Sequence, residues 1–108
     1  MMTTYYGAYG ANLNKQEMHV RCPAARPVER INLLDRMLVF KGFADMIADP
    51  GKRTPIGVYE ITENCERALD QYESYPFLYG KEYLNVRLSS GPTQIMIYVM
   101  NDGHGFAT

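Results

Sequence analysis

The chain has 108 residues, enough for one domain around one modest core, and its hydrophobic share of 46% excludes a disordered protein. The formal net charge of −1 and the isoelectric point near 6.1 give no electrostatic case for binding nucleic acid or an acidic membrane surface. The longest apolar run, residues 95–100, is far too short to span a bilayer, and no apolar signal segment stands at the N-terminus. We therefore expect a single domain over residues 1–108, located in the cytoplasm.

The first predicted elements are a strand, indicated by the strand-forming residues 3–6, and a short helix over residues 14–20. Asn14 is a suitable N-cap for this helix. Backbone amides at the corner between them, residues 10–13, can hold an anion or a carboxylate, and Gly10 lets a ligand approach the backbone. A plain turn between a strand and a helix explains the same residues, so local chemistry leaves both interpretations open.

The next part of the chain is predicted to be irregular and then extended. Pro23 and Pro27 remove backbone donors, so residues 20–30 should run irregularly over the surface of the sheet. Residues 33–47 are rich in strand formers and predict one long strand or two strands, with a bulge or sharp bend at Gly42.

A turn, a strand and a second helix follow. The Asp-Pro-Gly sequence at residues 49–51 predicts a turn, and residues 54–61 predict a strand. Thr62 is expected to cap a helix that ends near residue 72. The apolar stripe of this helix consists of Cys65, Ala68, Leu69 and Tyr72.

Two further strands complete the predicted sheet. Residues 82–88 alternate in polarity, and residues 93–100 are apolar on both faces, which is typical of a strand inside a sheet. Residues 101–108 are expected to fray. The tally is five or six strands and two helices without strict alternation, which predicts the α+β class with a mixed, strongly curved sheet that forms a small barrel with two flanking helices.

The cysteines and histidines indicate no metal site. Cys22 and Cys65 are far apart in the sequence, and neither a C-x-x-C motif nor a zinc-like spacing occurs. A disulfide between them is compatible with the sequence, but two buried thiols in a reducing cytosol are favoured. His19 and His104 are isolated and are expected at the surface.

Four stretches of the sequence resemble, in the same order, motifs of the gamma-glutamylcyclotransferase family. They are residues 6–13, 21–26, 54–59 and 69–76. The first is similar to the family's substrate loop, Tyr-Gly-Ser-Asn-Leu, and the likeness extends over about nine-tenths of the chain. The resemblance implies a mixed barrel with flanking helices and a pocket at one end.

Glu73 is the candidate catalytic residue. It ends the second predicted helix beside bulky, mostly neutral residues, and partial desolvation there should raise its pKa toward neutrality, as a general base near pH 7 requires. A solvated glutamate at a helix end explains the same position. The resemblance points to Glu73 as the acid/base residue, because the family's glutamate lies in a matching Asp-x-x-Glu-Gly segment, although Ser74 replaces the glycine here.

The resemblance further implies release of 5-oxoproline from a gamma-glutamyl amino acid or amine by intramolecular aminolysis, without metal or other cofactor. The substrate-binding candidates are Tyr6, Gly7, Ala8, Tyr9, Gly10, Ala11, Asn12, Leu13 and Tyr79. Strand alternation predicts that Tyr6 and Tyr9 point to opposite faces unless the strand bends. The expected partner is a small gamma-glutamyl substrate, with no nucleic acid or membrane, and the chain is expected to be a monomer or a homodimer.

Three departures from the family pattern support an alternative function. Ala11 replaces the family's serine, which removes a hydroxyl worth roughly 0.5–1.5 kcal/mol. Gly7 stands where the family usually has an aromatic residue, and the sequence ends at Thr108, before the family's Pro-Ser segment and closing tyrosine. The alternative is a protein that binds a small anionic metabolite on the same scaffold without converting it.

Overall fold

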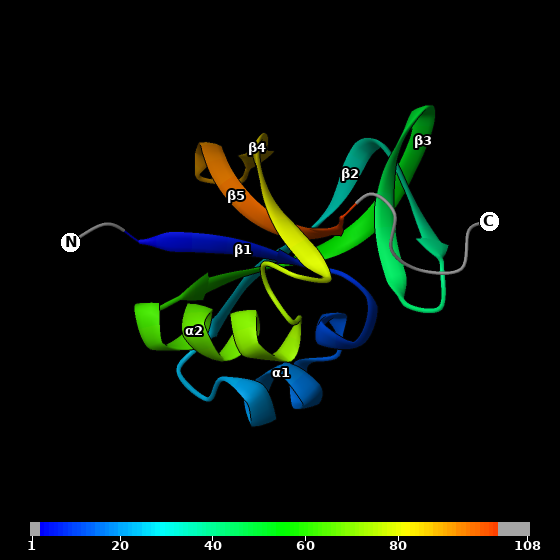
Figure 1. Cartoon of the computed structure of the whole chain (residues 1–108). Helices are drawn as coiled ribbons and strands as arrows, with labels where there is room; N and C mark the ends of the chain where they lie inside the picture. The colour runs from blue at the N-terminus through cyan, green and yellow to red at the C-terminus, as the bar shows by residue number, and fades with distance from the viewer. Residues whose placement is uncertain (1–2, 102–108) are drawn as a thin grey trace.

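The computed structural model describes residues 3–101 and contains a mixed five-stranded sheet with both helices on one side of it (Figure 1). The strands are β1 (Thr4–Ala8), β2 (Arg26–Phe40), β3 (Ala44–Ile61), β4 (Tyr79–Leu88) and β5 (Gly91–Met100). The other elements are the 3-10 turn η1 (Gly10–Leu13) and the helices α1 (Lys15–Arg21) and α2 (Glu63–Tyr72). The strand order is β2-β3-β1-β5-β4, and β1 pairs with β5 in parallel. The predicted α+β class is confirmed.

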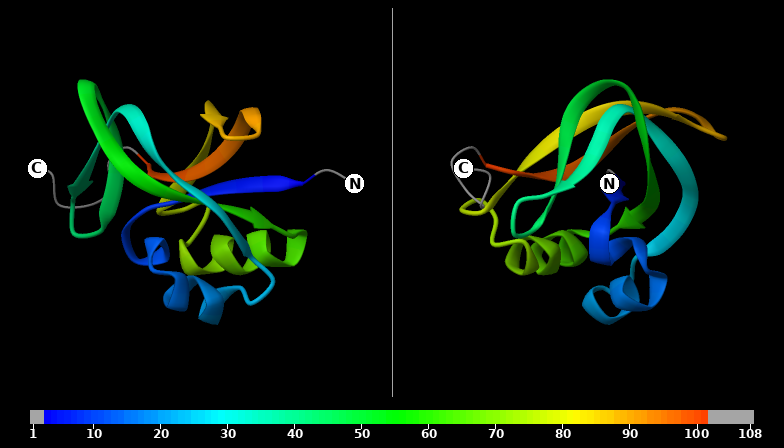
Figure 2. Two further views of the ribbon diagram at one scale, coloured as in Figure 1. Left: turned by 180° about the vertical axis from the view of Figure 1, so that it is seen from behind. Right: turned by 90° about the vertical axis from the view of Figure 1, so that its right-hand side faces the viewer.

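The sheet arches over the helices but remains open among the described residues (Figure 2). β2 and β4 are its two edges, so the expected barrel does not close through backbone pairing. Instead, Arg36 of β2 and Glu82 of β4 form a bidentate ion pair between the two edge strands, with nitrogen–oxygen distances of 3.1 and 2.5 Å.

Residues on both faces of the sheet are buried. One cluster lies between the sheet and the helices and includes Tyr6, Met96 and Tyr98, and a second cluster on the opposite face includes Ile95 and Ile97. Alternate residues of β5 thus enter different clusters, as its two apolar faces predicted, and β5 lies inside the sheet between β1 and β4.

The prediction of an irregular segment over residues 20–30 is wrong in its second half. β2 begins at Arg26 and includes Pro27, which is opposite Tyr59. Because β2 is an edge strand, the missing donor of a proline need not interrupt a ladder on both sides. The register shift between Pro27 and Glu29 shows that the regular pairing with β3 is interrupted next to the proline.

The predicted turn at residues 49–51 is not a chain reversal. β3 continues through it, and the pairing jumps from Leu34 opposite Arg53 to Arg36 opposite Ala48. Both Asp35 and Gly51 adopt positive φ, 61° and 85°, and the Gly51 amide donates to Asp35 Oδ1 at 3.0 Å. The turn-forming residues therefore build a bulge inside a long hairpin, whose actual reversal lies between Phe40 and Ala44.

The predicted helix starts are confirmed by their caps. The Asn14 side chain accepts from the amides of Gln16 and Glu17, and Thr62 Oγ1 accepts from the Cys65 amide at 3.1 Å. His19 is exposed, as expected. His104 and most of the segment that was expected to fray lie outside the described residues. Within residues 3–101, no helix has the length and apolar character needed to cross a membrane.

A disulfide joins the two helices. Cys22, the C-cap of α1, is bonded to Cys65 of α2 across a Cα–Cα distance of 5.3 Å, and both residues are buried. The prediction of two separate thiols is wrong, because folding brings together two cysteines 43 positions apart. The cytoplasmic location stays a prediction.

Reduction of this disulfide should lower the thermal stability of the protein. A bridge that closes a loop of 43 residues constrains the unfolded chain and contributes about 2–4 kcal/mol, so dithiothreitol should lower the Tm by roughly 10 °C. Circular dichroism melts with and without the reductant measure the difference. A double variant, Cys22→Ser with Cys65→Ser, is the control and should not respond. Equal melting temperatures of the native chain in both conditions would contradict the assignment.

Candidate functional site

A cavity of about 580 Å³ opens at the corner between β1 and η1, beside the C-terminal end of α2. This volume lies within the range of ordinary small-molecule sites. Its walls come from β1 and η1, the β2–β3 turn, the end of α2, the approach to β4, and β5. They consist of Tyr6, Tyr9, Gly10, Asn12, Phe40, Gly42, Phe43, Ala44, Tyr72, Glu73, Ser74, Leu78, Tyr79 and Tyr98.

Four of the tyrosines that line the cavity, Tyr6, Tyr9, Tyr79 and Tyr98, take part in hydrogen bonds. Tyr9 donates to the backbone oxygen of Tyr98, and the Tyr79 hydroxyl donates to the backbone oxygen of Ala44 at 2.5 Å. Burial raises the pKa of Tyr6, Tyr9 and Tyr98, and burial together with the charge on Glu73 raises the pKa of Tyr79 to about 12. These phenols therefore stay protonated at neutral pH. Tyr9, Tyr79 and Tyr98 donate hydrogen bonds to the protein, whereas the Tyr6 hydroxyl accepts one from Asn12.

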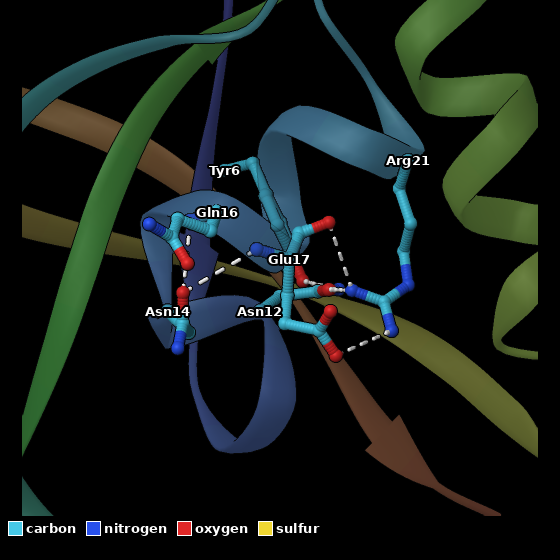
Figure 3. A network of polar contacts seen from close by, with 6 residues as sticks. All are labelled: Tyr6, Asn12, Asn14, Gln16, Glu17 and Arg21. Atoms are coloured by element: carbon cyan, nitrogen blue, oxygen red, sulfur yellow. Dashed lines mark hydrogen bonds and ion pairs between the residues drawn. The ribbon is translucent and has the colours of Figure 1, made fainter.

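Arg21, the last residue of α1, holds the cavity-lining residue Asn12 in place (Figure 3). Its Nη1 donates to Asn12 Oδ1, and Asn12 Nδ2 donates in turn to the Tyr6 hydroxyl at 3.0 Å. The guanidinium also lies over the Tyr72 ring, 3.7 Å from the centroid, and 3.9 Å from the Glu17 carboxylate. A chain of contacts thus fixes Asn12, which is buried, to both helices.

Glu73 is the one charged residue in the cavity wall among the residues that the structure describes. It is the C-cap of α2, where its amide donates to the Leu69 carbonyl at 2.8 Å, and its side chain is partly buried. Burial raises the pKa of Glu73 to about 7, while the charge on Arg21 pulls it down. At neutral pH the carboxyl group is therefore present in both forms, as a group that takes up and returns a proton requires.

The structure brings together only part of the predicted site. Tyr6, Tyr9, Gly10, Asn12, Glu73 and Tyr79 line the cavity. Tyr6 and Tyr9 both reach it, despite the alternation expected for a strand, because β1 ends at Ala8 and the chain then turns. Ala11 belongs to η1, and its side chain lies outside the described part of the structure.

Three predicted site residues do not line the cavity. Gly7 faces the second core cluster, where an added Cβ would lie 2.9 Å from Ile97 and 3.0 Å from Ile95. Ala8 is fully buried in the first cluster. Leu13 packs toward Gly57, whose lack of a side chain leaves room for it. Their contribution is to shape the corner, not to contact a ligand in the cavity.

The wall that comes from the β2–β3 turn has no signal in the sequence. Phe40, Phe43 and Ala44 belong to a segment predicted only as strand, and no local pattern places them opposite a corner 30 residues earlier in the chain. Arg21 lies in one of the stretches that resemble the family, residues 21–26, but it was not predicted as a site residue. Among residues 3–101, no group of three histidine, cysteine, aspartate or glutamate side chains is placed to bind a metal ion.

The link between Arg21 and Glu73 can be measured directly. Replacing Arg21 with glutamine removes the charge that favours ionised Glu73, so the pKa of Glu73 should rise further. NMR titration of the Glu73 carboxyl carbon measures this pKa without reference to activity. Arg21→Lys keeps the charge and is the matched control, with a smaller shift expected. An unchanged or lower pKa in the glutamine variant would show that Arg21 does not act on Glu73.

Comparison with known proteins agrees with the motifs in the sequence. A family model described as gamma-glutamyl cyclotransferase, AIG2-like, matches residues 6–107, a range that contains the β1–η1 corner and Glu73. The chain belongs to this family. No curated protein matches the chain.

Solved structures share the fold of this gamma-glutamyl cyclotransferase family. One named gamma-glutamyl cyclotransferase is 21% identical, with a TM-score of 0.83 over 96% of this chain and 70% of that one. An uncharacterised human protein is 23% identical, with a TM-score of 0.83 over 97% and 70% of the two chains. A mouse AIG2-like protein is 19% identical, with a TM-score of 0.72 over 96% and 81%. At these identities the likeness shows the fold.

Proposed function

We propose that the protein is a cyclotransferase that releases 5-oxoproline from a gamma-glutamyl amino acid or amine, with Glu73 as the acid/base group. The observation that carries the proposal is the position of Glu73, a partly buried carboxyl group with a pKa of about 7, in the wall of a cavity whose other described lining is uncharged. Membership of the gamma-glutamyl cyclotransferase family supports the same reaction.

The proposed reaction joins two ends of the substrate's own glutamyl group. The Glu73 carboxylate takes a proton from the α-ammonium, and the freed amine attacks the side-chain carbonyl carbon to close a five-membered ring. The C–N bond to the leaving amine then breaks as the protonated Glu73 gives its proton to the leaving nitrogen, and the ring nitrogen loses its second proton to the released amine or to solvent. The products are 5-oxoproline and a free amine or amino acid, and the cycle returns Glu73 to its starting state without a cofactor.

The corner between β1 and η1 would hold the substrate's α-carboxylate. The first amides of a helical turn have no acceptor within the turn, and Gly10 lines the cavity without a side chain in the way. Asn12 is held beside Gly10 by Arg21 and Tyr6. Fixing the glutamyl chain in a folded conformer can contribute several kcal/mol to the reduction of the barrier.

The test is a direct assay of 5-oxoproline with a panel of gamma-glutamyl amino acids and amides. Release of 5-oxoproline in proportion to enzyme concentration is the expected result. Calorimetry on the same compounds separates this function from the alternative, because tight binding without turnover would identify a binding protein. The position of Gly7 does not favour that alternative, since Gly7 lies in the core and its missing side chain does not enlarge the cavity.

A further inference from the structure

Lys81 of β4 places a mostly buried positive charge against α2. Its side chain is 11% exposed, and its Nζ lies 2.6 Å from Glu66 Oε2 and 3.0 Å from Asp70 Oδ1. Burial lowers the pKa of Lys81, but the hydrogen bonds to these two carboxylates outweigh burial and raise the pKa above its ordinary value. The side chain is therefore an ammonium group at neutral pH, and it holds two successive turns of α2.

The same ammonium group contacts the chain on both sides of Glu73. Asp70 is three residues before Glu73, and the ring of Tyr75, two residues after it, has its centroid 4.2 Å from Lys81 Nζ. The Tyr75 amide also donates to the Asp70 carbonyl at 2.8 Å, which closes the turn that contains Glu73. Glu73 lines the cavity, whereas Lys81, Asp70 and Tyr75 do not. Lys81 thus holds this turn without contacting the cavity itself.

Asp70 also connects Lys81 with the wall of the cavity. The Tyr98 hydroxyl donates to Asp70 Oδ1 at 2.6 Å, and Tyr98 is a lining residue. The backbone oxygen of Tyr98 accepts the hydrogen bond from Tyr9, which precedes Gly10 of the β1–η1 corner. A series of contacts therefore joins the turn that bears Glu73 to the corner that would hold the substrate.

We propose that Lys81 is a positioning residue, which holds Glu73 in the cavity wall at the place that ring closure requires. This inference rests on the proposed function, because Lys81 acts on the reaction only through Glu73. Without the ammonium group, Glu66 and Asp70 would be two like charges four residues apart on one helix, which weakens α2. The Tyr75 ring would lose its cation as well, so the turn that contains Glu73 would loosen and admit water.

Lys81→Met tests the proposal in steady-state kinetics, because it removes the charge and nearly keeps the length of the side chain. We expect kcat to fall about tenfold and KM to change less than about twofold, since a misplaced acid/base group slows the reaction while the corner still holds the substrate. Asp70→Asn keeps an oxygen for Tyr98 but removes the ion pair with Lys81, so it should lower kcat in the same way, and it replaces Lys81→Met if that variant does not fold. A kcat within about twofold of the native value in both variants would overturn the proposal.

Arg36→Met is the matched control for a general loss of stability. The Arg36 side chain is 18% exposed and pairs with Glu82, the residue that follows Lys81 on β4, so the variant breaks a comparable ion pair on the same strand. Neither Arg36 nor Glu82 lines the cavity. Urea denaturation should show a loss of stability in both methionine variants, but only Lys81→Met should lose kcat. Equal losses of kcat would mean that Lys81 acts through stability alone and would overturn the proposal.

The pKa of Glu73 reports its surroundings without turnover and is measured by NMR titration. Burial raises this pKa to about 7, and the charge on Arg21 lowers it. A looser turn would hydrate Glu73, so its pKa should fall toward the ordinary value of 4.5 in Lys81→Met and should stay near 7 in Arg36→Met. Removal of a cation that acted directly on Glu73 by its charge would instead raise the pKa. A raised or unchanged pKa in Lys81→Met would therefore overturn the proposal.

The two measurements together distinguish the role of Lys81 from the proposed reaction. If no gamma-glutamyl compound is turned over but the pKa of Glu73 falls in Lys81→Met, the proposed reaction fails while Lys81 still positions Glu73. If 5-oxoproline is released and Lys81→Met changes neither kcat nor this pKa, the reaction stands and the positioning role is overturned.

Discussion

Glu73→Gln is expected to lower the rate of 5-oxoproline release by about 10²–10⁴-fold, with a much smaller effect on KM. The glutamine amide fills the same space and can still form hydrogen bonds, but it cannot take a proton from the α-ammonium or return one to the leaving nitrogen. Steady-state kinetics on the best amide of the panel measure the loss. Turnover that survives within tenfold of the native rate would remove Glu73 from its proposed role.

The same variant should be more stable than the native protein above neutral pH. The pKa of Glu73 is about 7 in the folded protein and 4.5 without burial, so the folded state loses stability as pH rises from 4.5 through 7. Glutamine carries no charge and avoids this cost, which we place at about 1–2 kcal/mol after allowance for solvent screening. Urea denaturation at pH 5 and pH 8 should show a gain only at the higher pH. If the Glu73→Gln variant is less active but more stable than the native protein, unfolding cannot be the cause of its lower activity.

Asp45→Ala is expected to reduce the free energy of unfolding by about 3 kcal/mol. Asp45 is only 3% exposed, and its Oδ1 accepts from the amides of Met46 and Met100, each at 2.8 Å. Its Oδ2 accepts from Lys41 at 2.9 Å. The carboxylate thereby ties the start of β3 to the end of β5, and alanine would leave two buried amides without their acceptor.

Urea denaturation measures this effect against two controls. Asp45→Asn keeps an acceptor oxygen and should cost less than the alanine variant. Asp49→Ala changes a partly exposed aspartate on the same strand and should stay within about 0.5 kcal/mol of the native protein. A loss below about 1 kcal/mol for Asp45→Ala would mean that these buried bonds do not hold the two strands together.

Features set by neighbours along the chain could be predicted from the sequence. Asn14 and Thr62 cap their helices through amides two or three residues away, and the two apolar faces of β5 follow from its own alternation. Features that depend on which strands pair with one another could not be predicted from the sequence. The edge position that admits Pro27 and the bulge at Gly51 depend on which strand lies opposite. The disulfide likewise depends on a distance that exists only after folding.

The candidate site divides in the same way. Glu73 and the residues around Gly10 carry a sequence motif, so they could be named before the cavity was known. Phe40 and Phe43 enter the site because a hairpin of more than 30 residues folds back over the corner, and nothing near them in sequence signals this. The role of Arg21 could not be predicted either, because it depends on contacts with Asn12 and Tyr72, which lie on two other elements.

A crystal structure of the Glu73→Gln variant with a bound gamma-glutamyl amide tests the central claim most directly. We expect the α-carboxylate at the amides of residues 10–12, and the substrate's α-nitrogen within about 3.2 Å of the side chain at position 73. A ligand seated in the corner with that side chain turned to bulk water, or a ligand bound elsewhere, would contradict the assignment of Glu73 as the group that drives ring closure.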